Sequence, residues 1–167
     1  MFKKIFLALA LILPLSGMAQ KFGVVDFNDV FQAMPETTAM MTQLEELSKK
    51  YEAEFQKLQD EVSKLYTEYQ TIQNDPATPE SIKERRIQEI TEKGQKVDQF
   101  RLTAQQDIQR QQETLAAPIQ AKLTEAVKAV GAEGGYTFIF PNEQGLLLYV
   151  GADVTNITAE VRKKLGI

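Results

Sequence analysis

The sequence contains no cysteine, no histidine and no tryptophan among its 167 residues. Without cysteine the chain can form no disulfide and offers no thiolate as a nucleophile or metal ligand. Without histidine it lacks the commonest metal ligand and the commonest general base near neutral pH. Its carboxylates are spread along the chain instead of clustering in one loop. We therefore expect no metal site, no cofactor and no catalytic residue, and predict that the protein is not an enzyme.

Long hydrophobic runs are also missing, except near the N-terminus. Residues 1–19 begin with Lys3 and Lys4, continue with an apolar run from Ile5 to Leu15, and end in small residues. This order is typical of a secretory signal peptide, with cleavage near Ala19-Gln20. The apolar run is shorter than the roughly 20 residues of a membrane-spanning helix. The sequence therefore predicts export of a mature chain that starts close to Gln20.

Basic charge is in short supply: 19 Lys and Arg face 23 Asp and Glu, for a net charge of −4. Nucleic-acid binding proteins usually display a basic stripe, so this balance argues against nucleic acid as a partner. It also provides no broad attraction to anionic membranes. Within residues 36–130 the two signs of charge are well mixed, which is typical of solvated helical faces.

Residues 36–130 carry the strongest pattern, a pair of predicted helices with a tip near 75–79. In the first helix, expected over Thr37–Asn74, apolar residues recur at spacings of three and four, as in one strand of a coiled coil. Pro76 and Pro79 then end the helix, and Thr78 is placed to cap the next one. The recurring residues are Leu44, Leu47, Tyr51, Phe55, Leu58, Val62, Leu65, Tyr69 and Ile72.

The second helix, expected over Pro79–Val130, has a poorer apolar stripe. Gly94, Arg101 and Gln111 fall on it, and a glycine inside a helix costs about 1 kcal/mol relative to alanine. Pro118 removes one backbone hydrogen bond, so we expect a kink there. The sequence predicts a hairpin that is only loosely held. Its return stripe is Ile87, Ile90, Val97, Ala104, Ile108, Leu115 and Ile119.

The flanking segments, residues 20–35 and 131–167, are predicted to form a small β-rich association body. Strands are expected at Phe22–Phe27, Tyr136–Phe140 and Leu146–Val150, the last two joined as a hairpin by residues 141–145. A short helix capped by Asn28 or Asp29 should end near Pro35, and another should run over Ile157–Leu165. The predicted fold class is α+β: a long antiparallel helical hairpin projecting from a small β-sheet body.

Such a body is too small to hide its own apolar residues and strand edges. We therefore predict that it oligomerises through a shared, β-barrel-like core. The candidate interface residues are Phe22, Val24, Tyr136, Phe138, Phe140, Leu146 and Leu148.

Several apolar residues in the hairpin fall off the predicted seam. Weak contacts by flexible or aromatic side chains suit a surface that holds varied unfolded polypeptides. The alternative is the ordinary scatter of apolar residues over a helix surface. The candidate contact residues are Met40, Met41, Tyr66, Phe100 and Leu102.

Several features occur together in this chain: the signal peptide, the Phe22-Gly-Val-Val-Asp26 strand, the Met34-Pro35-Glu36 step, the long hairpin and the closing stretch from Asp153 to Val161. In this layout the mature chain resembles the Skp, or OmpH, family of periplasmic chaperones. The motifs themselves match at the two ends, where the closing stretch is similar to the C-terminal signature of the family. The hairpin itself matches only in period and length.

This resemblance implies a periplasmic homotrimer whose helical arms enclose a cavity. Such proteins hold unfolded outer-membrane β-barrel proteins without ATP and prevent their aggregation. Well-known members are strongly basic, whereas this chain is acidic, so binding to membranes or lipopolysaccharide is not expected to carry over. The alternative function is a periplasmic structural or adaptor coiled coil that docks a partner through its hairpin.

Overall fold

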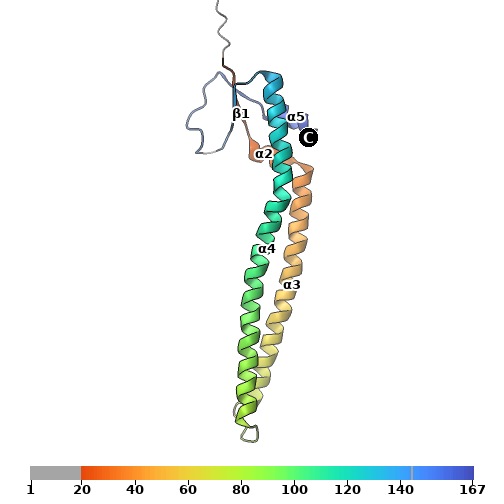
Figure 1. Ribbon diagram of the computed structural model, residues 1–167, viewed down its shortest axis with the longest axis vertical. Coiled ribbons are helices and arrows are strands. Elements are labelled where there is room, and N and C mark those ends of the chain that lie inside the picture. The colour runs from red at the N-terminus through yellow and green to blue at the C-terminus, as the bar shows by residue number, and fades with distance from the viewer. Residues whose placement is uncertain (1–19, 144) are drawn as a thin grey trace, which may run out of the picture. The chain divides into compact units, whose positions relative to one another are not determined.

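The computed structural model describes residues 20–143 and 145–167, so the predicted signal peptide lies outside the described residues. The elements follow the order β1, α2, α3, α4, β2, β3 and α5 (Figure 1). Two long helices and a small three-stranded sheet confirm the predicted α+β class. The chain divides into two compact units. The hairpin unit comprises Phe31–Lys122, and the body comprises the described residues before and after it.

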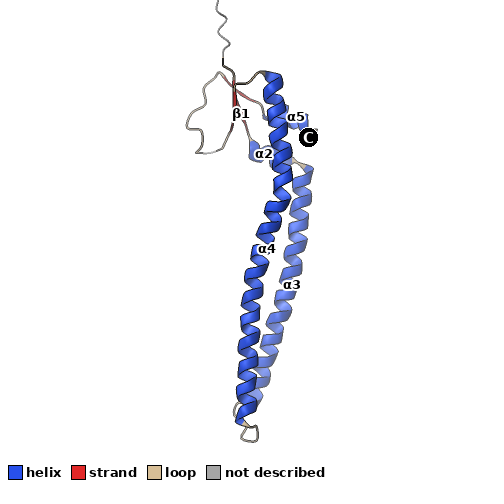
Figure 2. Cartoon of the chain, in the orientation of Figure 1, coloured by secondary structure: helices blue, strands red, loops and turns tan. Residues whose placement is uncertain are grey.

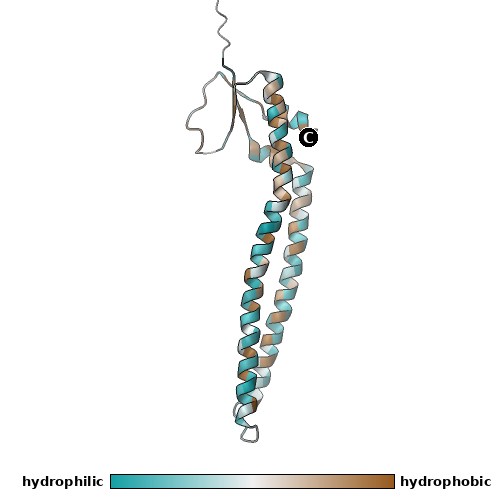
Figure 3. Cartoon of the chain, viewed as in Figure 1, coloured by the Kyte–Doolittle hydropathy of each residue, from teal (hydrophilic) through white to brown (hydrophobic). Residues whose placement is uncertain are grey.

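The hairpin unit contains α3, which spans Pro35–Ile72, and most of α4, which spans Glu80–Gly134. All nine apolar residues predicted for the α3 stripe are half-buried, which confirms the heptad interpretation. No residue between Met41 and Thr103 is fully buried. Two helices alone cannot enclose a side chain on every side, so this part of the hairpin has a seam and no true core. Figure 3 shows how few apolar residues the two helices contain: they occur in separate bands along mainly hydrophilic helices.

The turn between the helices is held by Asp75. Its carboxylate accepts hydrogen bonds from the Ala77 amide at 3.0 Å and the Thr78 hydroxyl at 2.7 Å. These bonds hold the pKa of Asp75 below its ordinary value, the Thr78 bond contributing most. The prediction that Thr78 caps α4 was wrong, because its hydroxyl donates to Asp75 and receives no hydrogen bond from an amide of α4. The amides of Ile82 and Lys83 reach the carbonyl oxygen of Pro79.

The body contains a parallel sheet with the strand order β2-β1-β3 (Figure 2). Strand β1 spans Phe22–Val25, β2 spans Phe138–Pro141 and β3 spans Val154–Asn156. The predicted strand over Leu146–Val150 is wrong, since these residues form turns and irregular backbone. The β-hairpin is wrong with it, because β2 pairs in parallel with β1 and not with the segment that follows.

Helices cover this sheet and supply most of its core. Helix α5 spans Thr158–Leu165, close to the predicted range, and packs against β1. Helix α2 spans Phe27–Ala33, so Asn28 and Asp29 lie inside it and do not cap it. The C-terminal part of α4 adds further buried side chains. The buried residues of the body include Val24, Val25, Val30, Leu123, Ala126, Val130, Ile157 and Val161.

Candidate functional site: two faces of the hairpin

One side of the hairpin is crossed by polar contacts between the helices, and we call it the ion-pair face. Arg86 lies 3.4 Å from Glu68, and Lys93 lies 2.5 Å from Glu61, seven residues further from the turn on both helices. Near the other end of the hairpin Lys122 pairs with Glu36. The ion-pair face is defined by these three pairs. Exposed pairs of this kind contribute little stability each, so their main effect is to set the register of the helices.

Two of these carboxylates, those of Glu36 and Glu61, are stabilised in their charged form. The hydrogen bond from Lys122 is the main reason that the pKa of Glu36 is lowered, and the bond from Lys93 does the same for the pKa of Glu61.

The opposite side of the hairpin contains shallow grooves, and we call it the groove face. It is defined by Ser48, Glu52, Phe55, Gln59, Ser63 and Tyr66 on α3, and by Gly94, Asp98, Arg101 and Gln105 on α4. Spacings of three and four place each set along one side of its helix. Two pockets open here, of about 370 and 460 Å³. Polar uncharged side chains and apolar carbon make up most of this surface, and few charges interrupt it.

Three of the predicted contact residues are exposed on or beside the groove face. Tyr66 lines one groove, with 53% of its surface exposed. Met41 precedes Ser48 by seven residues, and Leu102 follows Asp98 by four, so periodicity places both on the same side. Each of these two exposes half of its surface or more. The hairpin thus presents exposed apolar groups on the side that lacks cross-helix ion pairs.

The other two predicted contact residues, Met40 and Phe100, were expected to lie off the seam. That expectation was wrong, because both pack between the helices. Met40 is only 7% exposed and lines a pocket beside Glu36, Pro118 and Lys122. Phe100 is half-buried and packs edge-on against Tyr51, with ring centroids 5.8 Å apart. Arg101, which the sequence pattern placed on the seam, is exposed instead.

The candidate association residues are divided between the body's core and its surface. Val24 is buried, Phe22 and Tyr136 are half-buried, and the others are exposed. Phe22 stacks on Phe138 at a centroid distance of 6.2 Å, and Phe140 lies 6.0 Å from Phe138. The three rings form an aromatic patch at the β2 edge of the sheet. Beyond it Leu148 is almost wholly exposed, at 97%.

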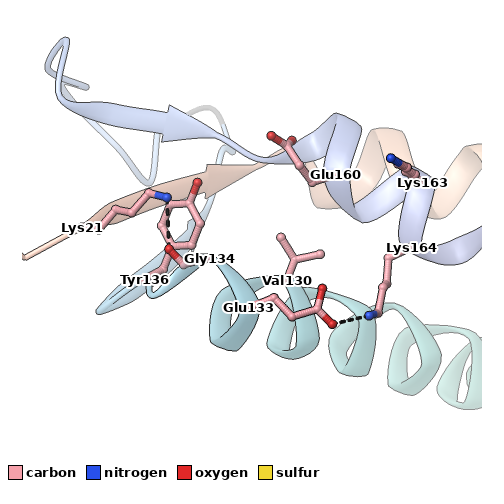
Figure 4. A pocket seen from close by; sticks show the side chains of 8 residues that line it. All are labelled: Lys21, Val130, Glu133, Gly134, Tyr136, Glu160, Lys163 and Lys164. Carbon is pink, nitrogen blue, oxygen red and sulfur yellow. Dashed lines mark hydrogen bonds and ion pairs between the residues drawn. The ribbon is translucent and has the colours of Figure 1, made fainter.

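The body also has a cavity of about 560 Å³ lined by residues of α4 and α5 together with Lys21 and Tyr136 (Figure 4). Three of its charged side chains already have partners: Lys164 pairs with Glu133, and Lys21 donates to the Gly134 carbonyl at 3.0 Å. The Lys21 ammonium also lies 4.1 Å from the centroid of the Tyr136 ring. The lining residues offer no nucleophile paired with a base, so this cavity does not suggest catalysis.

These features define a helical-hairpin protein with a small parallel sheet and an extended, weakly apolar face. The family model "Outer membrane protein (OmpH-like)" matches residues 21–165, and the chain belongs to this family. Chaperone protein Skp of Yersinia enterocolitica is 28% identical over 160 residues, which cover 95% of this chain and 94% of the relative. Chaperone protein Skp of Pectobacterium atrosepticum is 30% identical over 163 residues, covering 94% of each chain. The family match confirms the predicted resemblance and the prediction of a non-enzymatic protein.

None of the helices in the described part of the chain is both long and apolar enough to cross a membrane.

Proposed function

We propose that this protein is an ATP-independent holdase that binds unfolded outer-membrane β-barrel proteins in the periplasm and prevents their aggregation. The observation that carries the proposal is the groove face, where exposed Met41, Tyr66 and Leu102 lie beside shallow pockets. The relatives named as chaperone protein Skp support the same class of function. The predicted signal peptide and this relationship support the periplasmic location in the proposal.

Such a face suits an unfolded client for energetic reasons. Each exposed apolar group can contribute only a small burial energy, so no single contact holds the client in one shape. Several contacts on one arm, and on neighbouring arms, add through multivalency. Because the hairpin lacks a core between Met41 and Thr103, it can bend to fit clients of different size.

Self-association through the body supplies the neighbouring arms in this proposal. The patch of Phe22, Phe138 and Phe140 lies beside an open strand edge, and exposed large apolar groups at such an edge favour pairing with another chain. We assign this contact to further copies of the same chain, in a homotrimer with a shared β-rich core. The groove faces of three arms would then border one client cavity.

An aggregation assay tests the function. A urea-unfolded outer-membrane barrel protein is diluted into buffer without nucleotide, with and without the mature chain, while light scattering reports aggregates. We expect suppression at about one assembled trimer per client. Absence of suppression at any ratio would reject the holdase and leave the adaptor function as the better account.

The assembly is tested separately by light-scattering mass. The mature chain should have the mass of a trimer, and the Phe138→Ser/Phe140→Ser variant should fall to the mass of a monomer. Ile82→Ser is the control, because it removes an exposed apolar side chain from the hairpin and should leave the mass unchanged. A monomeric unmutated chain at micromolar concentration would contradict the proposed assembly.

A further inference from the structure

The groove face contains one pocket, of about 370 Å³, where three aromatic side chains meet. Tyr51 and Phe55 approach it from α3 and Phe100 from α4. The Tyr51 and Phe100 rings are already arranged edge-to-face, at an interplanar angle of 63°. We call this site the aromatic pocket. Its remaining lining residues are Ser48, Glu52, Arg101, Ala104, Gln105 and Ile108.

The pocket is open because one of its lining residues, Ala104 of α4, has a small side chain. Ala104 is buried, with 8% of its surface exposed, and lies on the seam where larger apolar residues stand elsewhere on α4. Its methyl group leaves room that a leucine or isoleucine would fill. Tyr51 is tethered by the hydrogen bond from its hydroxyl to Asp107, at 2.7 Å, so its ring is not free to swing into this space.

The charge at the pocket also favours an aromatic occupant. Arg101 is exposed and forms no ion pair within 4.0 Å with any carboxylate of residues 20–143 and 145–167. A guanidinium group interacts favourably with the electron-rich face of an aromatic ring. Ring edges and faces already present in the pocket add the preferred offset and edge-to-face contacts. An aliphatic side chain of equal size would bury the same apolar surface in the pocket. It would gain neither the interaction with the guanidinium group nor the contacts between aromatic rings.

We propose that the aromatic pocket binds an aromatic side chain of an extended client polypeptide and so makes the arm selective for aromatic-rich segments. This inference rests on the proposed holdase function and adds to it a preferred side-chain class and a defined site. Exposed residues such as Met41 and Leu102 then hold neighbouring apolar groups with little selectivity.

Two synthetic peptides test the selectivity. Both have ten residues of serine, threonine and glycine around one central residue, which is phenylalanine in one and cyclohexylalanine in the other. The two side chains match in size and differ in their π system. Titrations follow the methyl resonance of Ala104 in the full mature protein. We expect the phenylalanine peptide to bind about three- to tenfold more tightly and to shift this resonance by its ring current. Equal affinities, or an unmoved Ala104 resonance, would overturn the proposal.

A variant whose pocket is filled by a larger side chain tests the location of the binding site. Ala104→Leu occupies the space, whereas the control Ala53→Leu adds the same side chain at an exposed position of α3. Ala104→Leu should abolish the preference for phenylalanine, and Ala53→Leu should keep it. If the preference survives Ala104→Leu, the site is wrong. If that variant fails to fold by circular dichroism, Arg101→Gln replaces it. Arg101→Gln removes an exposed charge and should reduce the preference at least twofold, and an unchanged preference overturns the proposal.

The aggregation assay separates this proposal from the holdase function. If the unmutated chain suppresses aggregation but does not distinguish the two peptides, the holdase stands and the aromatic pocket fails. If the chain distinguishes the peptides but suppresses no aggregation, the pocket is a binding site and the holdase fails.

Discussion

The hydroxyl of Tyr51 in α3 donates a 2.7 Å hydrogen bond to Oδ2 of Asp107 in α4. This bond joins residues 56 positions apart in the chain, near the middle of the hairpin. It lowers the pKa of Asp107, to which Arg110 also contributes, and it raises the pKa of Tyr51. The Tyr51 ring meanwhile packs against Phe100, so one residue provides both a polar and an aromatic contact between the helices.

Tyr51→Phe isolates the polar part of this relationship. The substitution keeps the ring and leaves the Asp107 carboxylate without its cross-helix donor. We expect faster amide hydrogen exchange in residues 48–55 and 104–110, with little change near the turn. Tyr66→Phe is the control, because it makes the same chemical change at an exposed tyrosine on the groove face. Equal exchange in the two variants would show that the Tyr51 bond does not hold the hairpin.

Acid should loosen the hairpin through its cross-helix carboxylates. The folded pKa of Glu61 lies below its ordinary value of 4.5, mainly because Lys93 donates to it, and the pKa of Asp107 lies below 3.8. A lowered folded pKa means that the contribution to stability is complete above the unfolded value and is lost as pH falls through the folded value. Stability should therefore decline progressively below about pH 5.

At alkaline pH the hairpin should lose stability as pH rises, because Tyr51 loses its proton. The pKa of Tyr51 is raised above 10.0, so the Tyr51 contribution is complete below pH 10 and is lost at higher pH. Urea midpoints measured between pH 3 and pH 11 check both limbs. A Glu61→Gln variant should show a smaller acid-induced decline than the unmutated chain. A midpoint that stays constant from pH 7 to pH 3 contradicts the assignment.

The hairpin was largely predictable from sequence because its heptad pattern is local. The α3 stripe was correct at every residue. On α4 two positions were wrong: Ile87 is 47% exposed, and Arg101 was placed on the seam that Phe100 occupies in the structure. Phe100 and Arg101 are adjacent in sequence and both border the seam, so the spacing of apolar residues does not show which of them packs there. The contact between the Phe100 ring and Tyr51 of the other helix places Phe100 on the seam.

The ion-pair face was missed, although the sequence contained a signal for it. Glu68 and Glu61 are seven residues apart, as are Arg86 and Lys93, and the two opposite-charge pairs lie at matching distances from the turn. Antiparallel helices bring such positions together.

The β-rich body was harder to predict, because parallel pairing depends on residues far apart in sequence. The apolar segment Leu146–Val150 suggested a strand by composition, yet β1 pairs with Val154–Asn156.

Gly134→Ala and Gly94→Ala should change stability in opposite directions. A Cβ atom at Gly134 would lie 2.8 Å from Cδ2 of Tyr136 and closer still to Cε2. The ring also lies against Gly23, so it has little room to move away. We expect Gly134→Ala to destabilise the protein by about 1–3 kcal/mol, as overpacking does. A Cβ atom added at Gly94 would meet no side chain and no part of another element within 4 Å, so alanine should stabilise the helix by roughly 0.5–1 kcal/mol.

Urea denaturation of both glycine variants measures these changes. Combining Gly134→Ala with Tyr136→Ala removes the clash, so the double variant should lose less stability than the two single changes together. Additive losses would mean that the Tyr136 ring is not what excludes a side chain at position 134.

The two faces of the hairpin should differ in their effect on client binding. Tyr66→Ser and Leu102→Ser on the groove face should each weaken binding of an unfolded barrel protein about two- to tenfold, since each removes roughly 0.5–1.5 kcal/mol of apolar burial. Ile82 precedes Arg86 by four residues, so periodicity places it on the ion-pair face, where it is 44% exposed. Ile82→Ser should leave client affinity unchanged. All three variants alter exposed side chains and should keep the thermal midpoint of the unmutated chain, which calorimetry verifies. Equal losses of affinity from both faces would show that clients contact the hairpin without regard to face.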